Sequence, residues 1–220
     1  MMDVWHVTWF SLATAAGATA VALPIGVPLA WLLARARFTG RSLVETIVSL
    51  PLVMPPVATG LILLMLFGRR GPLGRALSWV GIDVVFTWKA VVIAMAVMGL
   101  PLLVRTARGG FEQVDRRLEQ VAATLGAGPA RVFLTISLPL AWPTVVAGAV
   151  LAFARALGEF GATIMIAGSI PGVTRTLAVA IYSYAETGQD RAAVALLAIS
   201  TGLAFAALWG ANRLAGGSRA

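Results

Sequence analysis

Two charged residues, Arg155 and Glu159, stand inside an otherwise apolar segment of this 220-residue chain. Their spacing of four residues places both on one face of a helix. An ionisable group at membrane depth is costly, so it indicates either a mutually neutralised pair that fixes helix packing or a water-lined path. In such a path the guanidinium would donate hydrogen bonds to an anion. Arg155, Glu159, Gly161 and Thr163 are therefore candidate pathway or gate residues, with ordinary packing as the alternative.

The residue types that other chemistries require are scarce. The chain has no cysteine and a single histidine, His6, so we expect no metal site. A phosphate-binding loop needs a lysine beside a serine or threonine after a glycine-rich turn, whereas the only lysine, Lys89, stands in the stretch TWKAV. Basic residues are scattered along the chain, which argues against nucleic-acid binding. We expect no bound cofactor and no ATP site on this chain.

The composition indicates an all-α integral membrane protein. Hydrophobic residues make up 59% of the chain and charged residues 12%, and the mean hydropathy is +0.89. Continuous apolar runs of about 20 residues cross a bilayer as helices. We expect a single domain, residues 1–220, with five spans. These are Trp5–Ala34, Leu43–Phe67, Trp88–Thr106, Ile136–Gly158 continuing toward Ala167, and Ala192–Leu214.

Prolines and one short apolar stretch modify this pattern. Kinks are expected at prolines in the first three spans, namely Pro24, Pro28, Pro51, Pro55, Pro56 and Pro101. Residues 172–186 are apolar, but Arg175 and Glu186 leave too short a core to span. We expect a short outer helix or a re-entrant segment there, and a sixth span is the alternative. Hydroxyls and a cation near this end form a candidate for anion entry, with an ordinary exposed loop as the alternative: Thr163, Ser169, Thr174, Arg175 and Thr176.

The distribution of basic residues predicts the orientation, because cytoplasmic loops carry an excess of them. With five spans, one side receives ten: Arg35, Arg37, Arg41, Arg105, Arg108, Arg116, Arg117, Arg131, Arg213 and Arg219. The other side receives six: Arg69, Arg70, Arg75, Lys89, Arg175 and Arg191. The amino terminus is therefore expected outside and the carboxyl terminus in the cytoplasm. The net charge of +8 reflects mostly this excess and says little about the substrate.

The segment Gly109–Pro139 has helical patterning between two spans, on the predicted cytoplasmic side. Apolar residues at 118, 121, 122 and 125 share one face of a helix expected at 117–125. Gly126 is placed to end this helix in a left-handed conformation, and Pro129 to begin a second helix that leads into the next span. Such a rigid element predicts docking on a soluble partner, and an amphipathic helix lying on lipid is the alternative.

The same segment resembles the EAA loop of bacterial ABC importer permeases. The resemblance rests on Gly126, on Ile136 ten residues later, and on Leu138 and Pro139. Gln120 stands where that family has its glutamate, with Glu119 one place earlier, so an ion-pair role at this position is left open. The resemblance implies that the loop docks on an ATP-hydrolysing subunit through Glu119, Gln120, Ala122, Ala123, Gly126, Arg131, Ile136 and Pro139.

Further stretches resemble the molybdate branch of that family, and the GEFGA segment is shared with sulfate permeases. They are LPLVMPPVATG (50–60), GRRGPLG (68–74), LEQVAATLGAGPARVFLTISLPL (118–140), LAFARALGEFGATIMIAG (151–168) and IPGVTRTL (170–177). The resemblance implies a type I importer domain in the bacterial inner membrane. It also implies two copies forming the passage, two ATPase subunits and a periplasmic or extracellular oxyanion-binding protein. Molybdate is favoured over sulfate or tungstate, and an ion-coupled secondary carrier is the alternative outside the family.

Overall fold

The structure is a computed structural model that describes residues 4–36 and 38–216. Within these ranges it consists of helices and contains no strand. Four helical stretches are long and apolar enough to cross a membrane: α1 (Val4–Arg35), α5 (Trp88–Gln113), the run Pro129–Leu157 and α11 (Asp190–Gly216). A fifth span exists if the bent pair α2 (Arg41–Val53) and α3 (Pro56–Phe67) counts as one. The predicted all-α membrane fold is confirmed. Two of the arginines counted for the orientation, Arg37 and Arg219, lie outside the described residues.

Two of the expected spans are broken. α2 and α3 meet at 114° across Met54 and Pro55, because consecutive prolines remove backbone donors and exclude the preceding residue from helical conformation. The fourth span does not continue toward Ala167. Instead α8 (Leu138–Leu157) ends and α9 (Gly161–Ala167) begins as a separate helix. By contrast, Pro24, Pro28 and Pro101 lie inside helices that are not interrupted.

Other boundaries also differ from expectation. α5 extends to Gln113, so the first residues of the segment 109–139 belong to a span rather than to a loop. α10 (Leu177–Glu186) has 10 residues, which corresponds to about 15 Å of helix, half the hydrocarbon thickness. It is therefore the expected short helix, and the sixth-span alternative is wrong for the described part of the chain. A further short helix, α4 (Pro72–Ser78), follows α3.

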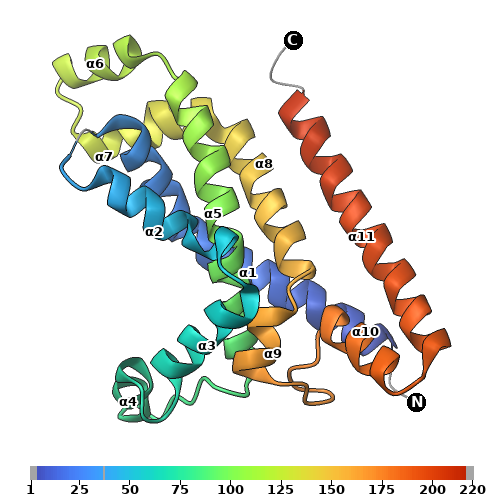
Figure 1. Ribbon diagram of the computed structural model, residues 1–220. Coiled ribbons are helices and arrows are strands. Elements are labelled where there is room, and N and C mark those ends of the chain that lie inside the picture. Colours follow the sequence, from blue (N-terminus) through green and yellow to red (C-terminus); the bar gives the residue numbers. More distant parts are fainter. Residues whose placement is uncertain (1–3, 37, 217–220) are drawn as a thin grey trace.

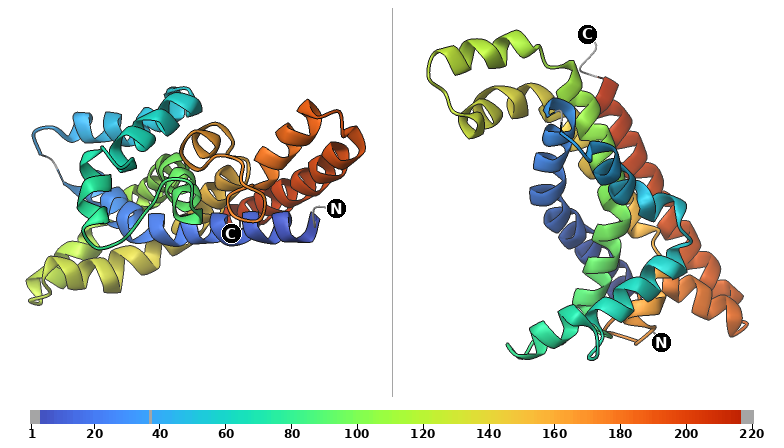
Figure 2. Two further views of the ribbon diagram at one scale, coloured as in Figure 1. Left: turned by 90° about the horizontal axis from the view of Figure 1, so that it is seen from below. Right: turned by 60° about the vertical axis from the view of Figure 1, so that its left-hand side comes forward.

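α5 lies at the centre of the bundle (Figure 1). α1 and α8 pack along it, α11 lies against α8, and α3 packs on α9. At one end of the molecule, α6 (Arg116–Thr124) and α7 (Pro129–Val132) project beyond the bundle, and the carboxyl-terminal end of α11 lies at the same end (Figures 1 and 2). The first turns of α1, together with α4, α9 and α10, lie at the opposite end (Figure 1).

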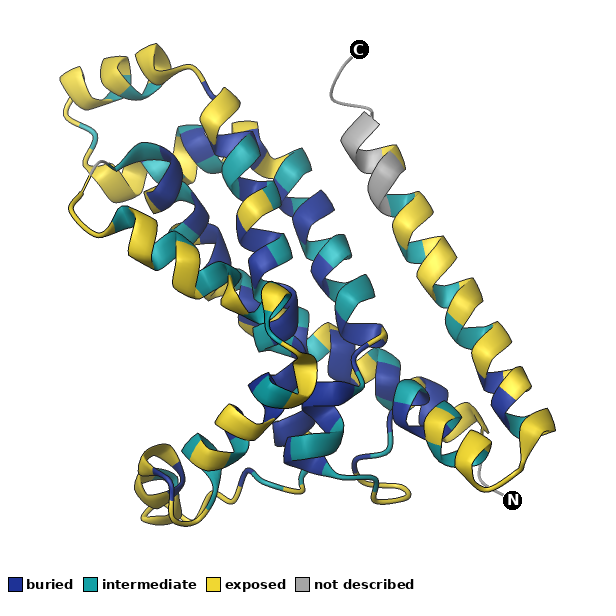
Figure 3. Cartoon of the chain, in the orientation of Figure 1, coloured by how far each residue is buried: buried dark blue, intermediate teal, exposed yellow. Residues whose placement is uncertain are grey.

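Small residues allow α8 to approach α5 closely. A Cβ atom built on Gly99 would lie 3.1 Å from the carbonyl oxygen of Ala152, and a Cβ on Gly148 would lie 3.1 Å from that of Leu103. A Cβ on Gly110 would collide with the hydroxyl of Thr144. Buried residues concentrate on α1, α5 and α8, whereas α6 and most of α11 are exposed (Figure 3).

We expect Gly110→Ala to destabilise the bundle, because overpacking of a tight contact costs about 1–3 kcal/mol. The matched control is Gly109→Ala, where a Cβ would meet no atom within 4 Å. Both changes improve helix propensity by about 1 kcal/mol, so only the contact distinguishes them. Thermal unfolding in detergent should give a lower midpoint for Gly110→Ala and an equal or higher one for the control. Equal midpoints for the two variants would contradict the close α5–α8 packing.

Candidate coupling and pathway sites

The segment between α5 and α8 forms the predicted helix, glycine turn and second helix. The Asp115 side chain accepts a hydrogen bond from the backbone N–H of Arg117 and so caps α6. Gly126 has φ +87°, the left-handed conformation expected of it. Pro129 is the first residue of α7. α6 begins and ends one residue before the predicted bounds, and the predicted arrangement is confirmed.

A π-helical turn, η1 (Phe133–Ser137), joins α7 to α8 without interruption. The ring of Phe133 lies 5.1 Å, centroid to centroid, from Trp31 of α1 and 6.0 Å from Phe111 of α5. These tilted aromatic contacts hold the start of α8 against both helices. The sequence predicts that the helix beginning at Pro129 leads directly into the next span. It contains no signal for the π turn, an element that is often found at functional sites.

Glu119 connects α6 to the bundle. Its carboxylate lies 3.0 Å from Nε of Arg35, at the end of α1, and accepts a 2.6 Å hydrogen bond from the hydroxyl of Ser137 in η1. Arg35 also donates to the carbonyl of Val114 at 2.8 Å. The Arg35 and Glu119 side chains are only 11% and 15% exposed, so solvent screens the pair weakly. We call Arg35, Glu119 and Ser137 the Glu119 clamp.

The clamp shows that an acidic residue of this segment forms an ion pair, a point that the sequence left open. Glu119 does form an ion pair, although it stands one place before the position of the family's glutamate. Its partner Arg35 is 84 residues away in the chain, and no local spacing rule relates residues so distant. The sequence assigns Arg35 a role only in orientation, and no local pattern in it points to Ser137.

The outer surface of α6 is uncovered. None of its residues is buried, and the apolar row Leu118, Val121 and Leu125 is exposed, Leu125 at 83% (Figure 3). An apolar row that its own chain leaves bare is typical of an interaction surface. The other expected docking residues are Gln120, Ala123, Arg131 and Pro139, which are exposed, and Ala122 and Ile136, which are half-buried.

Arg155 and Glu159 lie together, as their spacing predicts. Nη1 of Arg155 is 2.7 Å from Oε2 of Glu159. Glu159 is only 1% exposed, and its other oxygen accepts a 2.8 Å hydrogen bond from the backbone N–H of Ala162 in the first turn of α9. The carboxylate thus caps α9 and is neutralised by Arg155, as in the packing alternative. Arg155 keeps part of its side chain exposed, at 27%.

The two helix breaks face one another. A Cβ on Gly161 of α9 would lie 2.8 Å from Cβ of Pro56, and a Cβ on Gly60 of α3 would lie 2.7 Å from the carbonyl of Ala162. Glycine is therefore required at both positions for α3 and α9 to approach. Thr163 is fully buried, and its hydroxyl has no hydrogen-bond partner among the described residues. Gly161 and Thr163 consequently lie in a packed contact.

The hydroxyls considered for anion entry stabilise their own loop instead. The Thr174 hydroxyl accepts from the backbone N–H of Ile170, and the Thr176 hydroxyl accepts from the N–H of Val179. Arg175 donates to the Ser169 side chain at 3.0 Å. Thr174 and Thr176 are fully buried, so their hydroxyls are not presented to an incoming anion, and the expectation of an exposed loop is wrong at these two positions.

We expect Glu119→Gln to loosen α6, because the charge-assisted contacts to Arg35 and Ser137 weaken together. Hydrogen exchange of the backbone amides of α6 should accelerate about tenfold, the equivalent of about 1.4 kcal/mol. Glu186→Gln, which removes a carboxylate at the other end of the molecule, should leave these amides unchanged. Exchange in Glu119→Gln at the wild-type rate would show that the clamp does not hold α6.

Known proteins share both the sequence and the fold. The chain is 48% identical over 206 residues to "Molybdenum transport system permease protein ModB" of Escherichia coli (strain K12), covering 93% of this chain and 90% of that protein. It is 48% identical over 178 residues to the protein of the same name from Haemophilus influenzae, covering 80% and 78%. A chain of the MetNI methionine ABC transporter in an inward-facing conformation has the same fold, with TM-score 0.71, 19% identity and coverage of 96% and 93%. Residues 26–215 match the model of one family, and the chain belongs to this family, the binding-protein-dependent transport system inner membrane components.

Proposed function

We propose that this chain is the membrane subunit of an ATP-driven importer and that it forms the passage for molybdate. The observation that carries the proposal is the 48% identity, over 93% of the chain, to a molybdenum transport permease. The helix-turn-helix with Gly126, followed by Leu138 and Pro139, and the glycine-dependent contact of Gly161 are the features expected of such a permease, and the geometry supports both.

The proposed importer contains several subunits and has a defined orientation in the membrane. Two copies enclose the passage in the bacterial inner membrane, two ATPase subunits bind and hydrolyse ATP, and a soluble oxyanion-binding protein delivers the anion from outside. The end that carries α6 and the carboxyl terminus faces the cytoplasm, and the amino terminus lies outside. The excess of arginines at the α6 end supports this orientation.

Residues 109–139 provide the mechanical connection in this proposal. The exposed row of α6 docks in a groove of the ATPase, and displacement of α6 passes through the Glu119 clamp to α1 and η1. Since η1 continues into α8, a movement of α6 reaches Arg155 in the last turn of that helix and, through their ion pair, Glu159 directly after it. Glu159 caps α9, so α9 moves with α8 as the passage alternates between outward-open and inward-open states.

Transport by the reconstituted complex tests the function. Liposomes that contain this chain, its ATPase and its binding protein should take up molybdate only when ATP is present on the side of the membrane that carries the ATPase subunits. Excess sulfate should not compete with molybdate for uptake. Uptake of sulfate instead would retain the coupling mechanism and change the substrate. If uptake instead requires no ATP and depends on a proton gradient, the protein is a secondary carrier and not an ATP-driven importer.

A disulfide cross-link tests the docking of α6. Ala123 is exposed, and the chain has no cysteine, so Ala123→Cys introduces a single thiol. It should cross-link to a cysteine placed in the groove of the ATPase, with a yield that changes when ATP is added. Ala76→Cys on exposed α4, at the other end of the molecule, is the matched control and should not react. If Ala123→Cys forms no more cross-link than the control, α6 is not the docking element.

A further inference from the structure

A cleft of about 510 Å³, lined by both polar and apolar residues, lies between α2 and α5. It extends from Ser42, in the first turn of α2, to Val53 beside the break between α2 and α3. It lies at the end of the molecule that carries α6, since α2 follows the end of α1 that holds Arg35. The polar residues of its wall are Ser42, Glu45, Thr46, Ser49, Arg105 and Arg108.

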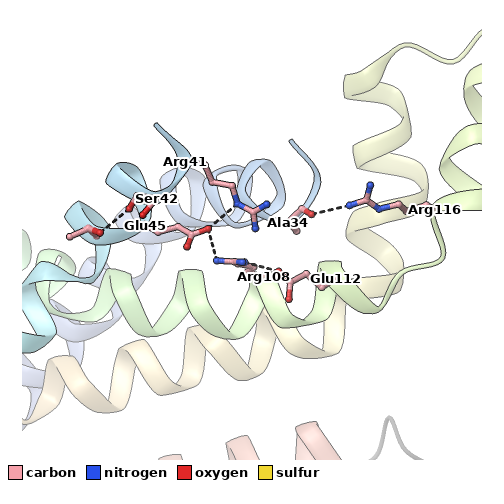
Figure 4. Close-up of polar contacts among 8 residues, drawn as sticks. Ala34, Arg41, Ser42, Glu45, Arg108, Glu112 and Arg116 are labelled. Atoms are coloured by element: carbon pink, nitrogen blue, oxygen red, sulfur yellow. Dashed lines mark hydrogen bonds and ion pairs between the residues drawn. The ribbon is translucent and has the colours of Figure 1, made fainter. Parts of the chain in front are cut away.

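The carboxylate in this wall is already neutralised. Glu45 Oε1 lies 2.9 Å from Nε of Arg41 and 2.8 Å from Nη1 of Arg108. Arg108 also pairs with Glu112 at 2.7 Å. Figure 4 shows these side chains pointing toward one another between α2 and α5. Glu45 therefore presents little net negative charge to a ligand in the cleft.

Arg105 contributes a positive charge to the cleft that no carboxylate in the described part of the chain neutralises. Among the described residues, no ion pair includes Arg105, and its side chain is exposed. It donates one hydrogen bond, 3.1 Å long, from Nη2 to the hydroxyl of Ser49. The wall of the cleft holds two guanidinium groups, Arg105 and Arg108, and one carboxylate, Glu45. The neighbouring Arg41 and Glu112 add one charge of each sign, so one positive charge remains uncompensated.

The hydrogen-bonding groups that remain are mainly donors. A guanidinium has five N–H groups, and one of those of Arg105 donates to the Ser49 hydroxyl. Because the Ser49 hydroxyl accepts from Arg105, its own proton is available to another acceptor. A fork of charged donors beside a hydroxyl donor matches a ligand that offers several negatively charged oxygens close together.

We propose that this cleft binds the transported tetrahedral oxyanion, held by Arg105 and the hydroxyl of Ser49, on the α6 side of the α2–α3 break. The proposal rests on the proposed function, because that function supplies the oxyanion and places this side toward the cytoplasm. The cleft is then a site that the anion occupies after it has passed the break between α2 and α3. α2 contributes one wall of the cleft, and it contacts the rest of the bundle through the ion pair of Glu45 with Arg108 and through the partly buried Val44 and Val48.

Direct binding tests the site. The complex of this chain with its ATPase, in nanodiscs without nucleotide and without binding protein, should bind radiolabelled molybdate saturably. Arg105→Gln should weaken this binding about tenfold, as expected for the loss of one charge-assisted contact. Arg70→Gln removes an exposed arginine at the opposite end and should bind molybdate like the wild type. Wild-type affinity in Arg105→Gln, or no saturable binding by the wild type, would overturn the proposal.

Two further measurements separate the possible failures. Arg105→Lys keeps the charge and loses the fork of donors, so its affinity for molybdate should lie between those of the wild type and Arg105→Gln. Arg105→Lys is also the variant to measure if Arg105→Gln does not assemble with the ATPase. If Arg105 only ties α2 to α5, both variants and Ser49→Ala will accelerate hydrogen exchange in α2 without changing molybdate affinity, which overturns the site. Uptake by the wild-type complex with unchanged binding in Arg105→Gln rejects the cleft alone, whereas absence of wild-type uptake rejects the proposed function.

Discussion

The close approach of α5 to its neighbours is the contact on which the rest of the fold depends. α1 and α8 both pack along α5, and α8 does so because Gly99, Gly110 and Gly148 lack a Cβ where the other helix passes. In lipid, helices gain little from hydrophobic burial against one another, so dispersion contacts between closely packed backbones stabilise the bundle. The remaining elements attach to this core: α11 through α8, α2 through α5, and α9 through both α5 and α3.

Paired carboxylates contribute to attaching α6, α2 and α9 to that core. Glu119 accepts from Arg35 and Ser137, Glu45 lies between Arg41 and Arg108, and Glu159 accepts from Arg155 and the N–H of Ala162. In each case one acidic group has two donors, which offsets the cost of holding a charge away from bulk water. These attachments are directional and few, whereas the α5–α8 contact is continuous. Movement of α6 relative to the core would therefore change a small number of polar contacts while the packing of the core persists.

Local patterns predicted the elements well and their interruptions less well. The glycine turn at Gly126, the start at Pro129 and the shortness of α10 follow from residues within one or two turns. Prolines predicted a kink in the second span, yet the structure turns by 114° at Pro55 while α1 runs on through Pro24 and Pro28. The consequence of a proline depends on whether neighbouring helices support a continuous axis or a bent one, and that support comes from distant parts of the chain.

The amino-acid sequence by itself determined the class of protein, the approximate spans, the amphipathic segment between α5 and α8, and the pairing of Arg155 with Glu159. Each of these depends on composition or on spacing along one helix, which are local properties. Only the tertiary structure decided that Glu119 pairs with Arg35, that the break before α9 faces the break before α3, and that Arg105 stands in a cleft with Ser49. These contacts join residues from different helices, and their geometry is set by how the helices pack, which no periodicity in a single segment encodes.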